Sequence, residues 1–173
     1  MRVVLITGGA RSGKSDYAMS LAENSAGKMV YIATATSGDP EMAERIRKHK
    51  EARGPAWRTV EEPLDILESV QRNSAIDTAV VLDCLTLWLT NIMMRDGEGF
   101  EPQAGQKSGE FVEALQGLPG TLIVVTNETG MGIVPDNAVA RRFRDAAGMV
   151  NSTFAQAADD VYFMVSGIPV KVK

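Results

Sequence analysis

The sequence has 173 residues, of which 45% are hydrophobic and 23% charged, and a formal net charge of −4. This length suits one compact domain and is short for two, so we expect a single domain over residues 1–173. The acidic balance argues against non-specific nucleic-acid binding, which needs basic surface to displace counterions from phosphates. A small anionic substrate held with a metal ion remains compatible with this charge.

Cysteine content and apolar runs bear on the compartment. Cys84 is the only cysteine, which excludes a disulfide framework and a cysteine-based zinc site. The apolar run at residues 3–6 is too short for a signal-peptide core and leads into glycines. No stretch approaches the ~20 apolar residues that span a bilayer. We therefore expect a cytoplasmic protein without a membrane span.

In chain order, short runs rich in β-branched residues alternate with helical patterns. Buried parallel strands are expected at residues 2–7, 29–34, 78–82 and 121–126. Helices are expected after Lys14 and at residues 41–51, 64–73 and 110–115. This alternation predicts a doubly wound α/β fold, in which a mostly parallel sheet carries helices on both faces.

The C-terminal third predicts a long helix and a hairpin. An apolar stripe predicts a helix at residues 137–158, and the tail at 161–172, broken by Gly167 and Pro169, predicts two strands at one sheet edge. Residues 95–109 are polar, glycine-rich and without period, which predicts a surface loop.

We expect the nine methionines to fill the core and assign Trp57 and Trp88 to no site. The helical stripe expected in the core consists of Val139, Phe143, Ala146, Ala147, Val150 and Phe154.

Residues 8–15 read GGARSGKS, which fits the phosphate-binding pattern G-x-x-x-x-G-K-[ST]. The motif follows an expected strand and precedes an expected helix, which disfavours the alternative of a chance glycine-rich turn. Backbone N–H groups would face the phosphates, Lys14 would reach the β and γ oxygens, and Ser15 would offer its hydroxyl to Mg²⁺. We therefore expect ATP or GTP to bind through Gly8, Gly9, Ala10, Arg11, Ser12, Gly13, Lys14 and Ser15.

Polar residues end the other expected strands. Asp83 follows an apolar run, as expected for an acidic residue that holds Mg²⁺ from the neighbouring strand of a P-loop protein. The alternative is an aspartate that caps the following helix. Residues 33–36 and 126–128 reach the same edge, where open α/β sheets bind ligands. Together they outline one crevice, although each alone could be an ordinary turn.

His49 is the only histidine, and helical spacing places it on the face of Met42 and Ile46 among basic neighbours. A neutral imidazole can attack a phosphate near pH 7 while nearby cations offset the charge. The alternative is a packed or solvated histidine on a charged helix, which spacing alone favours.

Taken together, these motifs resemble the bifunctional adenosylcobinamide kinase and adenosylcobinamide-phosphate guanylyltransferase family of cobalamin biosynthesis. The similar blocks occur in order over nearly the whole chain, which is more specific than a P-loop alone. They are residues 6–15, 31–35, 42–46 with His49, 57–63, 82–91, 126–135 and 166–171. The resemblance implies a RecA-like P-loop fold, a homotrimer, and small-molecule substrates rather than nucleic acid. It also implies phosphorylation of cobinamide, followed by GMP transfer through a guanylyl-histidine.

Carried onto this sequence, the resemblance implies that His49 is the guanylylated residue, that Lys14 and Asp83 are catalytic, and that Ser15 and Asp83 hold Mg²⁺. Residues 95–109 match no motif of the family. Besides the P-loop, the implied nucleotide contacts are Ala33, Thr34, Ala35, Lys50, Glu51, Ala52, Arg53, Glu61 and Asp83.

Two other functions remain open from the sequence. In a monofunctional P-loop kinase, His49 would be a helix-face residue, and GTP would leave no stable covalent label. In a nucleotide-driven ATPase or switch, hydrolysis would proceed without an acceptor. The sequence also leaves open whether the kinase step prefers ATP or GTP.

Overall fold

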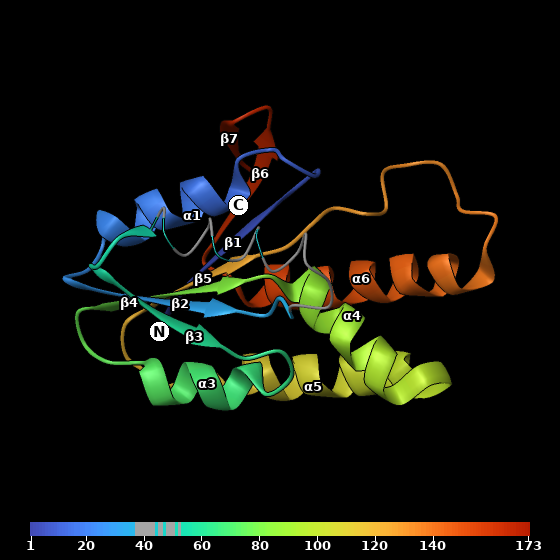
Figure 1. Cartoon of the computed structure of the whole chain (residues 1–173), viewed down its shortest axis with the longest axis horizontal. Coiled ribbons are helices and arrows are strands. Elements are labelled where there is room, and N and C mark those ends of the chain that lie inside the picture. Colours follow the sequence, from blue (N-terminus) through green and yellow to red (C-terminus); the bar gives the residue numbers. More distant parts are fainter. Residues whose placement is uncertain (37–43, 45–46, 48–50, 52) are drawn as a thin grey trace.

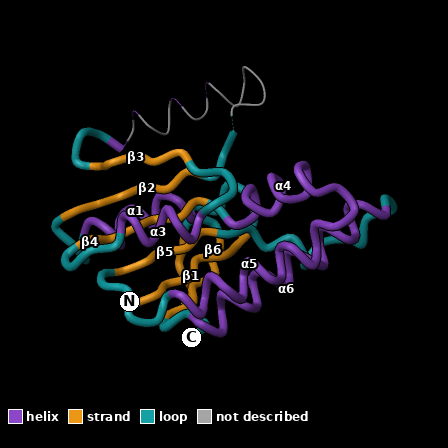
Figure 2. Tube along the Cα trace, turned by 90° about the horizontal axis from the view of Figure 1, so that it is seen from below, coloured by secondary structure: helices purple, strands orange, loops and turns teal. Residues whose placement is uncertain are grey.

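The computed structural model describes residues 1–36, 44, 47, 51 and 53–173. Within them lies a seven-stranded sheet of order β3-β2-β4-β5-β1-β6-β7, and Figure 2 shows its strands side by side. The pairs from β3 through β6 are parallel, and β7 pairs antiparallel with β6. The strands are β1 (Arg2–Gly8), β2 (Lys28–Ala33), β3 (Trp57–Glu61), β4 (Thr78–Asp83), β5 (Thr121–Val125), β6 (Asp160–Val165) and β7 (Ile168–Lys171).

Helices cover both faces of the sheet (Figure 1). Successive strand residues point to opposite faces, so Val80 and Leu82 of β4 join one core cluster, and Ala79 and Val81 join the other. Helix α1 packs on the second cluster, whereas α3 to α6 pack on the first. The helices are α1 (Lys14–Glu23), α3 (Ile66–Asn73), α4 (Leu85–Asp96), α5 (Phe100–Ala114) and α6 (Ala138–Ala157), with a 3₁₀ turn at Gly97–Gly99.

The four expected strands, the long C-terminal helix and the terminal hairpin are confirmed. The expected helix at residues 41–51 falls largely outside the described residues. Strand β3 was not predicted, because its five residues are mostly half-exposed or exposed at a sheet edge and lack a continuous apolar run.

The surface loop expected at residues 95–109 is wrong, since α4 ends at Asp96 and α5 begins at Phe100. Helix α5 buries Phe100, Ala104 and Ser108 at four-residue spacing, and the Ser108 hydroxyl donates to the Ala104 carbonyl over 2.7 Å. A Cβ built on Gly105 would stand 3.3 Å from Cε of Met149 in α6. The small and polar residues that suggested a loop therefore let two helices approach closely.

Two expectations about core residues are also wrong. Val139 is 52% exposed, because α6 begins beyond the carboxyl edge of the sheet (Figure 1). Met94, Met131 and Met149 are exposed by 78%, 79% and 42%, so they do not fill the core. The rest of the expected stripe on α6 packs against the first cluster.

Gly120, which precedes β5, is a position where an added methyl group should be costly. Its φ is +86°, and a Cβ there would stand 2.5 Å from the Ala75 carbonyl and 2.6 Å from the Thr78 carbonyl. Gly117 has nearly the same φ, +85°, but open space around it. Left-handed backbone costs a non-glycine residue about 1–2 kcal/mol, and overpacking adds about 1–3 kcal/mol.

We therefore expect Gly120→Ala to reduce the free energy of unfolding by about 1–3 kcal/mol more than the matched control Gly117→Ala. Urea unfolding of the two variants measures the difference. Equal losses would show that the carbonyls near Gly120 relax without cost.

Candidate functional site

The P-loop connects the carboxyl end of β1 with the amino end of α1. Gly8 has φ +147°, and a Cβ there would stand 2.7 Å from the Met164 carbonyl, so this position requires glycine. Gly13, with φ +89°, is the N-cap of α1 and provides no side-chain cap. The first N–H groups of α1 therefore remain available to an anion.

Lys14 lies within the curve of this loop. Its Nζ donates to the Gly9 carbonyl over 2.6 Å and lies 3.5 Å from Oγ of Ser12, and the residue is only 8% exposed. Burial lowers the pKa of Lys14, and the charge of Asp83 partly opposes this shift. The ammonium group is thus close to the atoms that would surround a triphosphate, whereas Gly9, Ala10 and Arg11 form the exposed tip.

Asp83, at the end of β4, meets the first turn of α1. The Ser15 hydroxyl donates to Oδ2 of Asp83 over 2.5 Å, and the Tyr31 hydroxyl donates to the same oxygen over 2.5 Å. The sequence analysis expected Asp83 on the strand next to the P-loop strand. In the structure β5 lies between β4 and β1, so the two strands are not neighbours. Helix α1 packs across β4 and β5 and so brings Ser15 to Asp83.

A hydroxyl and a carboxylate fit Mg²⁺, which binds oxygen and is usually completed by water and substrate phosphates. Among the described residues, no three or more His, Cys, Asp or Glu side chains are grouped so that they could hold a metal ion. Burial, together with the negative charge of Asp83, raises the pKa of Tyr31, which stays protonated as a donor.

The implied contacts at the end of β2 are largely enclosed. Thr34 is fully buried, and its hydroxyl donates to the Cys84 carbonyl over 2.8 Å and accepts from the Cys84 N–H over 2.7 Å. Its backbone N–H donates to the Asp83 main-chain carbonyl, and its own carbonyl accepts from the Asn91 side-chain amide. Thr34 therefore joins the ends of β2 and β4, while Ala33 is buried beside it and Ala35 is half-buried.

The next implied contacts, at residues 49–53, are only partly covered by the described residues. His49, Lys50 and Ala52 lie outside the described residues. Glu51 is exposed and pairs with Arg47. The Arg53 guanidinium carbon lies 3.8 Å from the centroid of the Tyr31 ring.

Glu61 is exposed at the end of β3, in register with Ala33. The structure thus gathers the P-loop and the ends of β2, β3 and β4 at one edge of the sheet.

Sequence reasoning placed residues 126–128 at this edge but did not identify the polar network that they form with α4 and α6. Thr126 donates to Asn151 over 2.7 Å, Asn151 donates to the Asn127 carbonyl over 3.0 Å, and the Asn127 N–H donates to Thr86 over 2.9 Å. These bonds tie β5 to α4 and α6. The role of Tyr31 was missed as well, although a tyrosine inside an apolar strand signals a buried hydroxyl that needs a partner.

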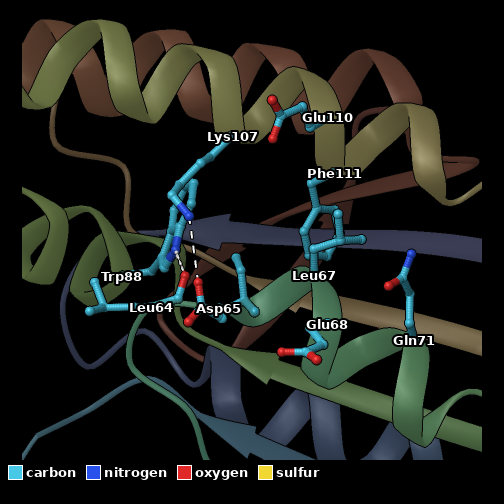
Figure 3. A pocket seen from close by; sticks show the side chains of 10 residues that line it. Leu64, Asp65, Leu67, Glu68, Gln71, Trp88, Lys107, Glu110 and Phe111 are labelled. Carbon is cyan, nitrogen blue, oxygen red and sulfur yellow. Dashed lines mark hydrogen bonds and ion pairs between the residues drawn. The ribbon is translucent and has the colours of Figure 1, made fainter.

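Two hollows lie away from the predicted site residues. The hollow in Figure 3, of about 220 Å³, lies between α3 and α5 beside Trp88. There Lys107 lies 3.6 Å from Asp65, and Trp88 donates to the Leu64 carbonyl over 3.0 Å. The second, of about 600 Å³, lies between α4 and the start of α6. Its lining residues are Thr90, Met93, Asn137, Val139, Ala140 and Phe143.

In the part of the chain that the structure describes, each helix falls short of the length or the hydropathy that crossing a bilayer requires.

Comparison with known protein sequences gives strong similarity over nearly the full chain. The family described as cobinamide kinase / cobinamide phosphate guanyltransferase matches residues 4–172. The bifunctional adenosylcobalamin biosynthesis protein CobP of Pseudomonas aeruginosa is 43% identical over 98% of this chain and 96% of its own length. The bifunctional adenosylcobalamin biosynthesis protein CobU of Salmonella typhimurium is 43% identical over 99% of both chains.

Comparison with solved structures confirms the RecA-like P-loop fold class. A prototypical ATPase from a bacterial type III secretion system has a TM-score of 0.58 and 13% identity, over 95% of this chain and 51% of that one. The RadB recombinase has a TM-score of 0.54 and 14% identity, over 94% of this chain and 73% of that one. At these identities, the likeness concerns the fold alone.

Proposed function

The chain belongs to the cobinamide kinase / cobinamide phosphate guanyltransferase family of enzymes, and we propose that it carries out both reactions. It phosphorylates adenosylcobinamide with ATP or GTP, and then transfers GMP from GTP to give adenosylcobinamide-GDP. The match over residues 4–172 carries this proposal. The P-loop and the adjoining Ser15–Asp83 pair support it, because both reactions need a triphosphate site.

In the kinase step, the cobinamide hydroxyl attacks the γ-phosphorus, the bond to the β-phosphate oxygen breaks, and the hydroxyl proton is released. Lys14 and the N–H groups of the P-loop offset charge on the β and γ oxygens. Ser15 and Asp83 would hold Mg²⁺, which when bound neutralises phosphate charge. The structure supports this role with two oxygen groups in direct contact.

In the guanylyl step, an imidazole nitrogen of His49 attacks the α-phosphorus of GTP, and the α–β bond breaks with release of pyrophosphate. A phosphate oxygen of adenosylcobinamide phosphate then attacks the same phosphorus and displaces His49. The histidine thus divides one difficult displacement between two anions into two easier ones. Support comes from the resemblance and from His49 being the chain's only histidine.

Incubation with GTP followed by intact-protein mass spectrometry tests this proposal. We expect the protein mass to rise by one guanylyl group, and the label to leave on addition of cobinamide phosphate. A protein that phosphorylates cobinamide but never gains this mass would be a monofunctional kinase. Turnover of nucleotide without any acceptor would instead indicate an ATPase or a switch.

The proposal extends to the organisation of the protein. We propose that residues 1–173 act as one domain in a homotrimer, and that the protein works in the cytoplasm, where nucleoside triphosphates are supplied. Light scattering coupled to gel filtration measures the oligomeric state. A monomer at the concentration of the assay would contradict the trimer.

Asp83→Asn should weaken the metal-dependent steps while leaving the fold intact. The amide keeps the size of the side chain but lacks the charge that attracts Mg²⁺. We expect the Mg²⁺ concentration at half-maximal kinase rate to rise by about 10- to 100-fold, with partial recovery at high Mg²⁺. Asp145→Asn, at an exposed position on α6, is the control. A Mg²⁺ dependence equal to wild type would leave Asp83 a structural residue.

A further inference from the structure

Tyr31 connects the middle of β2 to the carboxylate at the end of β4. The residue is 4% exposed, and its hydroxyl donates to Oδ2 of Asp83 over 2.5 Å. Strands β2 and β4 are paired with Tyr31 opposite Val81 and Ala33 opposite Asp83. The Tyr31 side chain therefore reaches along the sheet to the site edge.

Neighbouring side chains hold the Tyr31 ring in place. The Arg53 guanidinium carbon lies 3.8 Å from its centroid, and the Trp57 ring meets it nearly edge-on, at 6.1 Å between centroids and 77° between planes. Trp57 is itself fixed, because its Nε1 donates to Glu23 of α1 over 3.0 Å. The phenol is thus held between β2, β3, α1 and Arg53.

Both donors to Asp83 act on the same oxygen. Ser15 and Tyr31 each donate to Oδ2, and none of the described residues donates to Oδ1. Two donors from different elements fix the plane of a carboxylate better than one, since a single bond leaves rotation about χ2. The orientation of Oδ1, on the same carboxylate, is then fixed as well.

We propose that Tyr31 is a positioning residue of the metal and phosphate site, which orients the Asp83 carboxylate through Oδ2. This inference rests on the proposed function, because it assumes that Asp83 serves Mg²⁺ and a triphosphate. The hydroxyl removes an orientational freedom that metal binding would otherwise have to remove. Tyr31 itself touches no phosphate in this scheme.

Tyr31→Phe tests the proposal by removing one oxygen and keeping the ring. The readout is equilibrium binding of a non-hydrolysable GTP analogue during a Mg²⁺ titration, with the thermal midpoint measured in parallel. Loss of a hydrogen bond to a charged group should raise the Mg²⁺ concentration at half-maximal binding by about three- to tenfold. Binding without Mg²⁺ should stay within about twofold, since the P-loop contacts are intact.

Tyr162→Phe is the matched control. Tyr162 is half-buried, packs against the core cluster that contains Tyr31, pairs edge-on with Tyr17 at 5.3 Å between ring centroids, and makes no hydrogen bond to Asp83. Tyr162→Phe removes the same hydroxyl from the same cluster and should leave the Mg²⁺ midpoint unmoved, whatever stability it loses. An equal shift in both variants, or none in Tyr31→Phe, would show that Tyr31 is merely structural.

A double-variant cycle isolates the path of the effect. In an Asp83→Asn background, Tyr31→Phe should change the Mg²⁺ midpoint much less than it does in the wild type, because the two residues act through one contact. A full additional shift would mean that Tyr31 acts elsewhere. Mg²⁺-independent binding by the wild type would overturn both this inference and the proposed metal role of Asp83, whereas an unmoved Tyr31→Phe beside a Mg²⁺-dependent wild type would overturn this inference alone.

Discussion

Lys14→Ala is expected to reduce phosphorylation of cobinamide to background. Lys14 is the P-loop side chain expected to reach the β and γ oxygens as the bond between them loosens. Removing one group that stabilises transition-state charge costs about 100- to 1000-fold in rate, and a full ammonium charge should cost at least as much. Labelling with GMP should fall as well, because both reactions use the same triphosphate site.

Lys28→Ala provides the control for this experiment. Lys28 is exposed at the amino end of β2, opposite the edge that carries the P-loop. Its removal should leave both rates unchanged. Circular dichroism and a melting curve check that Lys14→Ala is folded, since Lys14 is buried and bonded to Gly9. A folded Lys14→Ala protein with near-normal kinase rates would mean that the triphosphate binds elsewhere.

The buried strands of the sheet and the P-loop were predictable because their signals are local. A parallel strand covered on both faces is a continuous apolar run, as in residues 79–82, and needs no knowledge of its partners. The glycines of residues 8–15 likewise predict the phosphate-binding loop, because only that local backbone conformation requires them at this spacing. The terminal hairpin was predictable for the same reason, because Gly167 interrupts an apolar stretch. In the structure this glycine adopts φ +87° at the turn.

Helix α5 was not predictable, because tertiary contacts hold it rather than its own propensity. Its sequence includes Gly105 and Gly109, which disfavour a helix, whereas Pro102 lies in the first turn, where proline is tolerated. Packing compensates: Phe111 lies 5.0 Å from Phe154 of α6 between ring centroids, and Glu101 pairs with Arg142. The expected helix at residues 110–115 captured the end of α5.

The contacts around Asp83 illustrate a second limit. The position of Asp83 at the end of an apolar strand predicts a metal-binding residue or a helix cap, and the metal role stays a prediction. The contact of Asp83 with Tyr31 depends on the pairing of β2 with β4 and on their register, which neither strand specifies by itself. Thr34 shows the same limit, since it reads as a ligand contact in sequence but bonds Cys84 across two strand ends.

His49→Ala is expected to eliminate covalent GMP labelling and formation of the GDP-linked product, while substantial kinase activity survives. The kinase step uses the cobinamide hydroxyl as its nucleophile, and only the guanylyl step needs an imidazole nitrogen. His49→Asn, close in size but without the nucleophilic ring, should behave in the same way. Intact-protein mass after GTP treatment and a separate kinase assay measure the two activities on one preparation.

The decisive comparison is between His49→Ala and Lys14→Ala, because the first should remove one activity and the second both. If His49→Ala lost the kinase step as well, the histidine would serve the fold or the shared triphosphate site. A folded His49→Ala protein that still carried acid-labile GMP would place the adduct on another nucleophile, such as a lysine, since the chain has no second histidine. Either result would overturn the assignment of His49, whereas loss of labelling alone makes it the attacking group of the guanylyl step.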